Sequence, residues 1–377
     1  MVKRMPVIDC DCHFETTIAR DEHPFREVLS RMPDSREVMR YAMTEDLARA
    51  TPREDRPAID EIVQFLPREN TSSMQQMLLE DAGDPEFVVS TVDERIGWMD
   101  DVGIDIALIN PGNWFLLAEF VDDRAAAFRR CNDFLADRLG ERTDRLLPVT
   151  LVDFSDLAGA AAELRRMRDR GSRAFWIEAR PFNGMSPAHP DWDVVWATAT
   201  DLGMIALLHV GRTPANFEGW GNAGWMQPGG GGMMGYFSYA NAMRHQAAEL
   251  LLAGMVYGGV FDRHPALTVV TEELLVSWLP GFVSRCDSFG RGDTVRRNIR
   301  ATPLIGLGDK DPLEAVLPLL PEMLVFSSDY PHGEGNASPI DLLEPALSNL
   351  DAAARAAFLG ENLADCFARM GDPLPVR

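Results

Sequence analysis

The sequence predicts an α/β protein, a TIM-like (β/α)8 barrel with a helical insertion after the first strand. Short apolar runs typical of strands alternate with amphipathic segments typical of helices through most of the 377 residues, which indicates a parallel sheet. Roughly eight such units occupy about 280 residues, a length that suits a closed barrel better than an open sheet. No glycine-rich phosphate-binding turn follows the first strand, which counts against a dinucleotide-binding fold.

The hydrophobic pattern predicts the elements in order. Each strand is a short apolar run, and the runs lie at 5–11, 104–110, 146–152, 174–179, 204–209, 267–272 and 323–328, with a weaker one around 298–304. The helices are amphipathic and are expected at 93–102, 122–142, 154–170, 191–202, 238–256 and 341–350. We therefore expect one barrel domain over residues 1–377.

Two segments interrupt this alternation. Residues 16 to about 92 are rich in charge and proline, and we expect a helical insertion over the barrel mouth. Residues 211–237 form a long loop rich in glycine and aromatic residues. Loops of this length inside a domain are usually functional, so we expect a lid over the site. An oligomer contact through Trp220 and Trp225 is the alternative.

Composition restricts the class of protein. There are 58 acidic and 36 basic residues, a formal charge of −22, which argues against nucleic acid or an anionic membrane as partner. No apolar run approaches the roughly 20 residues that span a bilayer, and no signal peptide is visible. Five cysteines without framework spacing fit reduced thiols. We expect a cytoplasmic enzyme with a small-molecule substrate.

Potential metal ligands stand at three predicted strand ends. Asp11 and His13 are two residues apart and share one strand face. His209 ends a second strand, and Asp329 follows a third. A lone strand-end histidine is usually structural, but the carboxyl ends of barrel strands converge on one site. Carboxylate and imidazole ligands without cysteine suit zinc, manganese or cobalt. Cys10 and Cys12 are expected to flank the ligands on the opposite strand face.

Several motifs together resemble a known family. They are IDCDCHF at 8–14, Leu208-His209, GGVFDRHPAL at 258–267, WLP at 278–280 and FSSDYPH at 326–332. With them the chain resembles the amidohydrolase superfamily, in the amidohydrolase-related branch that includes aminocarboxymuconate-semialdehyde decarboxylase and the resorcylate-type decarboxylases. The resemblance spans the chain except for the insertion and the lid.

The resemblance implies a TIM-like barrel that holds one divalent metal, with zinc expected first and manganese or cobalt as alternatives. The ligands would be Asp11, His13, His209 and Asp329 with a water, and barrels of this family commonly form homodimers. Asp11 stands where other members have histidine or glutamate.

A second departure concerns the sixth strand. Leu274 stands six positions before Pro280, where many members carry a histidine that contacts substrate in the decarboxylases. Glu273 or His245 could take over the catalytic role of that histidine, although a surface or helix-capping role is favoured for His245.

These residues suggest a metal-dependent hydrolase acting on a small carbonyl compound, which could be aromatic or carboxylated. The metal would acidify a bound water, and Asp329 would act as general base and then acid. A non-oxidative decarboxylase on the same scaffold is the first alternative, and an inactive ligand-binding barrel is the second. The leucine at position 274 favours hydrolysis, and the complete ligand set argues against the inactive barrel.

Substrate contacts are expected from arginines and tryptophans near the strand ends. Arg180 and Arg212 could anchor a substrate carboxylate, although Arg180 could instead pair with residues next to Glu178 or take part in a cap. Trp114 and Trp225 could wall an aromatic or apolar group.

Overall fold

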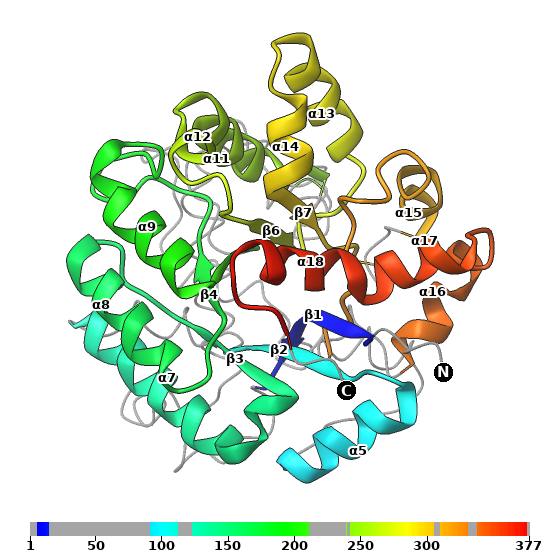
Figure 1. Ribbon diagram of the computed structural model, residues 1–377, viewed down its shortest axis with the longest axis horizontal. Helices are drawn as coiled ribbons and strands as arrows, with labels where there is room; N and C mark the ends of the chain where they lie inside the picture. The colour runs from blue at the N-terminus through cyan, green and yellow to red at the C-terminus, as the bar shows by residue number, and fades with distance from the viewer. Residues whose placement is uncertain are drawn as a thin grey trace, which may run out of the picture.

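Seven parallel strands in sequence order form the inner wall of the computed structural model (Figure 1). The structure describes residues 6–14, 91–111, 123–210, 239, 242–304, 310–330 and 338–374. The strands are β1 (Ile8–His13), β2 (Ile106–Asn110), β3 (Leu146–Thr150), β4 (Ala174–Ile177), β5 (Ile205–His209), β6 (Val269–Glu272) and β7 (Ile299–Ala301). All their residues are buried, as expected of strands covered on both faces.

The sheet closes into a barrel through the segment 323–330. Ala301 of β7 pairs in parallel with Leu324, and Cys12 of β1 pairs in parallel with Tyr330. The segment thus takes the eighth position between the last and the first strand. The predicted (β/α)8 barrel is confirmed.

The eighth position is irregular, and no continuous strand forms at 323–328. The amide of Ser328 donates to the Asp9 carboxylate at 2.8 Å, where a regular ladder would use a backbone carbonyl. The amide of Phe326 donates to the carbonyl of Phe358, outside the sheet. These two bonds replace ladder bonds, so the segment forms isolated bridges at Leu324 and Tyr330, although backbone bonds such as that from Cys10 to Phe326 also join it to β1.

Helices surround the strands (Figure 1). They are α5 (Val92–Val102), α7 (Arg124–Leu139), α8 (Leu157–Arg168), α9 (Asp193–Leu202), α11 (Gln246–Tyr257), α12 (Val260–Arg263), α13 (Leu279–Ser288), α14 (Gly292–Asn298), α15 (Lys310–Val316), α16 (Pro339–Leu347), α17 (Ala352–Ala356) and α18 (Asn362–Arg369). Short 3-10 turns lie at Gly140–Asp144 and Pro190–Trp192, and a π turn lies at Ala357–Glu361. The predicted helices correspond to α5, α7, α8, α9, α11 and α16.

Local sequence explains where α5 begins and ends. The Thr91 hydroxyl accepts from the amide of Glu94, and the Glu94 carboxylate accepts from the amide of Thr91, which is a capping box. Gly103 ends the helix with φ 82°, a left-handed conformation that glycine adopts without strain. The chain then enters β2.

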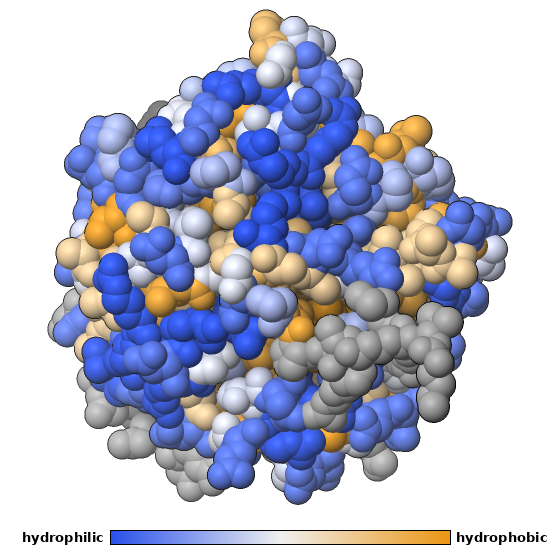
Figure 2. All heavy atoms as spheres, in the orientation of Figure 1, coloured by the Kyte–Doolittle hydropathy of each residue, from blue (hydrophilic) through white to orange (hydrophobic). Residues whose placement is uncertain are grey.

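The C-terminal helix α18 closes the end of the barrel where the strands begin. The Arg369 guanidinium donates to the hydroxyl of Thr268, one residue before β6. In Figure 1, α18 lies across the ring of strands. Hydrophilic residues cover much of that face, with scattered apolar patches (Figure 2). The carboxyl ends of the strands therefore point to the opposite side of the molecule.

Aromatic packing fixes the position of β4. Phe154, Phe175, Phe182, Trp192 and Trp196 stack in one cluster with neighbouring ring centroids 4.9–6.5 Å apart. Burial of each large side chain contributes about 1.5–3 kcal/mol. This cluster packs α9 against β4, the strand that pairs with β5.

The structure does not test the expected insertion or the expected lid. The expected insertion lies almost wholly outside the described residues, and the expected lid at 211–237 lies wholly outside them. In the described part of the chain, none of the helices combines the length and the apolar character needed to cross a bilayer.

Candidate metal centre

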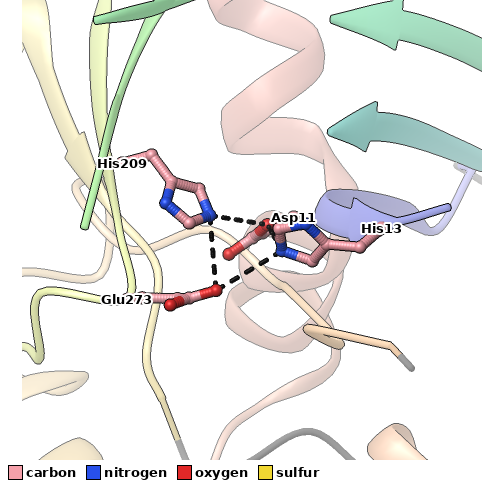
Figure 3. Close-up of side chains that lie close together, drawn as sticks. All are labelled: Asp11, His13, His209 and Glu273. Carbon is pink, nitrogen blue, oxygen red and sulfur yellow. Dashed lines mark ion pairs between the residues drawn. The ribbon is translucent and has the colours of Figure 1, made fainter. Parts of the chain in front are cut away.

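Three strands bring two imidazoles and two carboxylates together (Figure 3). Asp11, His13, His209 and Glu273 each offer one ligand atom, and the four atoms lie within 4.8 Å of one another. His13 Nε2 lies 3.0 Å from Asp11 Oδ1 and 3.4 Å from Glu273 Oε1. His209 Nε2 lies 3.3 Å from the same Glu273 oxygen. All four side chains are buried, so they form a closed polar centre.

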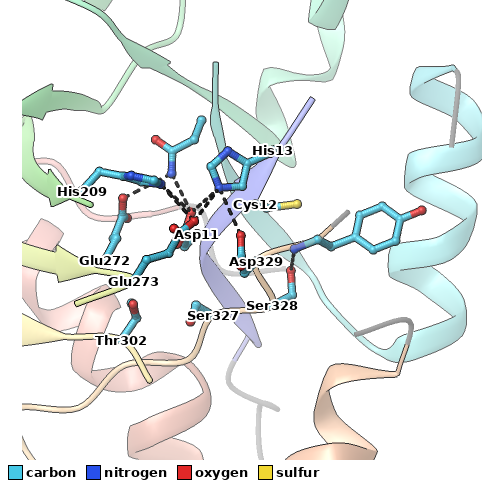
Figure 4. A network of polar contacts seen from close by, with 12 residues as sticks. Asp11, Cys12, His13, His209, Glu272, Glu273, Thr302, Ser327, Ser328 and Asp329 are labelled. Atoms are coloured by element: carbon cyan, nitrogen blue, oxygen red, sulfur yellow. Dashed lines mark hydrogen bonds and ion pairs between the residues drawn. The ribbon is translucent and has the colours of Figure 1, made fainter. Parts of the chain in front are cut away.

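Asp329 lies at the edge of this centre. Its Oδ1 is 3.3 Å from His13 Nε2 (Figure 4), and its amide donates to the carbonyl of Asp11 at 2.8 Å. The preceding Ser328 is held by Asp9, which accepts from the serine amide at 2.8 Å and from its hydroxyl at 2.5 Å. Asp9 therefore holds the chain that presents Asp329 to the centre.

Backbone strain is concentrated at the site. Glu273 (φ 56°), Leu275 (φ 63°) and Asp329 (φ 52°) are non-glycine residues in the left-handed region. Each such residue costs about 1–3 kcal/mol. The strain turns Glu273 toward the two histidines directly after β6. Leu274, the residue noted in the sequence as a departure from the family pattern, is buried beside it in the hydrophobic core.

The tautomer of His209 suits a metal ligand. Its Nδ1 lies 2.6 Å from the carbonyl oxygen of Val210, which can only accept, so Nδ1 carries the hydrogen and Nε2 offers a lone pair to the centre. Burial acts to lower the pKa of His209, but Glu273 and then Asp11 outweigh it, and the pKa is raised. The centre thus stabilises positive charge at Nε2, which a divalent cation would supply.

A second buried carboxyl positions Asp11. Asn110 Nδ2 donates to Asp11 Oδ1 at 2.8 Å and to Glu272 Oε2 at 3.2 Å. Burial, and then the charge of Asp11, raise the pKa of Glu272 well above its usual range. Asp11 Oδ2 has no hydrogen-bond partner among the described residues. This oxygen, with the Nε2 lone pair of His209, fits a divalent cation.

Cys10 does not face away from the ligands as expected. Its thiol lies 3.5 Å from Glu272 Oε1, inside the barrel. The pairing of β1 with β2 shifts register between Asp9 and Cys12, and this irregularity breaks the simple alternation of strand faces. Cys12 contacts α5, where it lies 2.8 Å from Arg95 Nη1.

Arg95 is a site neighbour that the sequence did not reveal. It is only 1% exposed and donates to the carbonyl of His13 at 2.8 Å. Its guanidinium carbon lies 4.5 Å from the centroid of the Tyr330 ring. One side chain thus links the end of β1 to the segment that carries Asp329. An arginine within an otherwise apolar helix face was the available signal.

His245 and Arg180 contact other partners. The His245 ring stacks on Trp278 with centroids 6.4 Å apart and lies 3.6 Å from Glu249, so it faces the groove between α11 and α13. Arg180 Nε donates to Glu178 at 2.5 Å, a partner that the sequence alone did not indicate.

Three other predicted contacts, Arg212, Trp114 and Trp225, lie outside the described residues.

A family model and several solved structures match this chain, in agreement with the barrel fold described above. The amidohydrolase family model matches residues 99–367. An amidohydrolase from Mycobacterium avium subsp. paratuberculosis K-10 is 21% identical, with 77% of this chain and 81% of that chain covered and a TM-score of 0.60. The 5-carboxyvanillate decarboxylase from Sphingomonas paucimobilis is 19% identical over 97% of this chain and 99% of that chain, with a TM-score of 0.59.

A third solved structure contains a metal. It is a 5-carboxyvanillate decarboxylase from Novosphingobium aromaticivorans DSM 12444, complexed with manganese and 4-hydroxy-3-methoxy-5-nitrobenzoic acid. It is 18% identical over 97% of this chain and 96% of that chain, with a TM-score of 0.60. At these identities the similarity shows a shared fold.

Proposed function

Because the chain belongs to the amidohydrolase family, we propose that it is a metal-dependent hydrolase that cleaves a small, neutral carbonyl group. The observation that carries this proposal is the excess of carboxylates in the centre. Asp11 and Glu273 lie among the histidines, and Asp329 lies beside them. When ionised they bring three negative charges, one more than a divalent cation neutralises.

The excess charge favours hydrolysis over decarboxylation. A decarboxylase has to hold a substrate carboxylate at the same centre, which would add a further negative charge to a buried site. Two like charges 4 Å apart repel by about 4 kcal/mol at the effective dielectric constant of a protein surface. A neutral amide, ester or lactone carbonyl avoids this repulsion.

Each residue has a proposed role. Asp11, His13, His209 and Glu273 would hold the cation, which would polarise the substrate carbonyl and acidify a water. Two imidazoles with carboxylates suit zinc first, while manganese is the metal of a solved relative. Asp329 would accept the proton of the attacking water and pass it to the leaving group. Asp9 and Ser328 would keep Asp329 within reach.

Decarboxylation is the second candidate. Its support is that decarboxylases match the chain over 97% of its length. The inactive ligand-binding barrel is disfavoured, because backbone strain and a buried polar centre are costly to retain without a function.

The cellular setting is also a proposal. All five cysteines are free and buried, which fits a reducing compartment such as the cytoplasm. A homodimer is supported by the family resemblance alone.

One experiment separates these readings. Protein purified without chelator is analysed for metals and then incubated with a panel of amides, esters, lactones and aromatic carboxylic acids, with parallel detection of hydrolysis products and carbon dioxide. We expect about one divalent metal ion per chain and hydrolysis without carbon dioxide release. Carbon dioxide as the sole product would establish the second candidate. Full activity in metal-free protein would refute both.

A further inference from the structure

Two arginines converge on one buried carboxylate just after β4. Arg124, the first residue of α7, pairs with Oε1 of Glu178. Arg180 Nε donates to Oε2 of the same residue at 2.5 Å. The Glu178 side chain is only 6% exposed, while the arginines are 19% and 24% exposed. Two cations thus meet one anion here, in a chain whose formal net charge is −22.

Strand register places the triad next to the candidate metal centre. Trp176 pairs with Leu207 and Ile177 with Leu208, and Glu178 follows directly after β4, beside the end of β5 that carries His209. Paired residues of neighbouring parallel strands project to the same side of the sheet, about 4.8 Å apart. The Trp176 ring lies 5.4 Å from the His209 ring, in agreement with this placement. The triad therefore stands at the barrel mouth, one strand away from the centre.

The guanidinium groups are held in place by aromatic rings as well as by Glu178. The Arg180 guanidinium carbon lies 4.4 Å from the centroid of Phe182, and that of Arg124 lies 4.8 Å from Phe128. Glu178 uses only the Nε of Arg180. No described residue takes a hydrogen bond from the two terminal nitrogens of this partly exposed side chain. A guanidinium edge of this kind matches the planar, bidentate geometry of a carboxylate.

We propose that Arg124 and Arg180, oriented by Glu178, form a subsite for a carboxylate group of the substrate. The inference rests on the proposed function and deepens it. The substrate would be a carboxylated carbonyl compound whose neutral carbonyl lies at the metal centre and whose carboxylate lies one strand away. Without such a subsite, the acidic chain and its carboxylate-rich centre would repel an anionic substrate.

The test uses benzoate and neutral benzamide as probes of metal-free protein, with calorimetry as the readout. Arg180→Met removes the charge but keeps an apolar stem over Phe182, and Arg180→Lys keeps the charge but loses the planar edge. Arg296→Met is the control, because Arg296 of α14 is also a partly exposed arginine that donates to a carboxylate, that of Asp287 in α13. We expect wild type to bind benzoate and not benzamide.

The variants should show whether the triad binds a substrate carboxylate or has only a structural role. Arg180→Met should weaken benzoate binding about 30-fold, the order expected for a hydrogen-bonded charged group. The benzoate affinity of Arg180→Lys should lie between those of wild type and Arg180→Met, and the affinity of Arg296→Met should match that of wild type. Absence of benzoate binding by wild type, or unchanged binding in folded Arg180→Met, would overturn the subsite and leave the triad as a structural brace. If Arg180→Met does not fold, equal binding by wild type and Arg180→Lys overturns the planar-edge argument.

Turnover gives a second readout once a substrate is known. The ratio of kcat/KM for the acid to that for its methyl ester should fall about 30-fold in Arg180→Met. An unchanged ratio would contradict the subsite. Benzoate binding does not depend on hydrolysis, so it can succeed where the proposed function fails, and the two failures are distinguishable.

Discussion

Replacement of Asp329 by asparagine should separate proton transfer from metal binding. Asparagine has the same shape and is among the few residues that tolerate the left-handed region, so φ 52° remains accessible. The bonds from Ser328 to Asp9 are untouched. An alanine would add backbone strain and confuse the result, which makes asparagine the informative change.

The expected changes in metal content and turnover of Asp329→Asn follow from the geometry of the centre. The four convergent ligand atoms do not include Asp329, whose carboxylate lies 3.3 Å from His13 at the edge of the group. Metal content should therefore stay near that of wild type. Turnover should fall at least ~100-fold, because a positioned proton-transfer group contributes about 10²–10⁴. Glu273→Gln should behave in the opposite way and lose most of the metal.

Elemental analysis and steady-state kinetics on the same preparations measure both effects. Asp287→Asn serves as the control, because this aspartate forms an exposed ion pair with Arg296, and it should match wild type in both assays. Near-normal turnover in Asp329→Asn would remove Asp329 from proton transfer. Loss of metal in Asp329→Asn, with metal retained in Glu273→Gln, would show that their proposed roles are exchanged.

Three further predictions concern the centre and the fold. His209→Ala should lose metal and activity together. Chelator treatment of wild type should reproduce the loss of activity and lower the Tm, because a metal bound only to the folded state stabilises it. A Tm unchanged by chelation would contradict this. Burial raises the pKa of Cys12 to about 12, so it stays protonated at pH 8, and mass spectrometry after iodoacetamide treatment should find it unmodified in native protein and alkylated after unfolding. Gly360→Ala should lower the free energy of unfolding by at least about 1–3 kcal/mol, measured in urea, because its Cβ would lie 1.9 Å from the Pro6 carbonyl oxygen; an unchanged midpoint would mean that the two segments separate easily.

The barrel and much of the centre could be predicted from the sequence. Hydrophobic runs locate buried strands, and the carboxyl ends of parallel strands must meet at one end of a barrel. That rule is enough to bring Asp11, His13 and His209 together, since each lies at such an end. It also gives the general position of Asp329.

The placement of adjacent residues at a strand end could not be predicted in this way. Glu272 and Glu273 are neighbours in sequence, yet Glu272 accepts from Asn110 and Glu273 joins the histidines. The left-handed φ of Glu273 decides this, and alternation along a strand no longer applies once the chain leaves the strand. Cys10 shows the same limit within β1, where the register shift turned its thiol toward Glu272.

Contacts between distant segments were decided by the tertiary structure alone. Asp9 and Ser328 are separated by 319 positions, and the triad of Arg124, Glu178 and Arg180 joins the start of α7 to the end of β4. Sequence pattern determines which face of an element is buried, because that depends on local periodicity. Which polar side chain meets which depends on closure of the barrel and on backbone dihedrals at the strand ends, and these are properties of the folded chain as a whole.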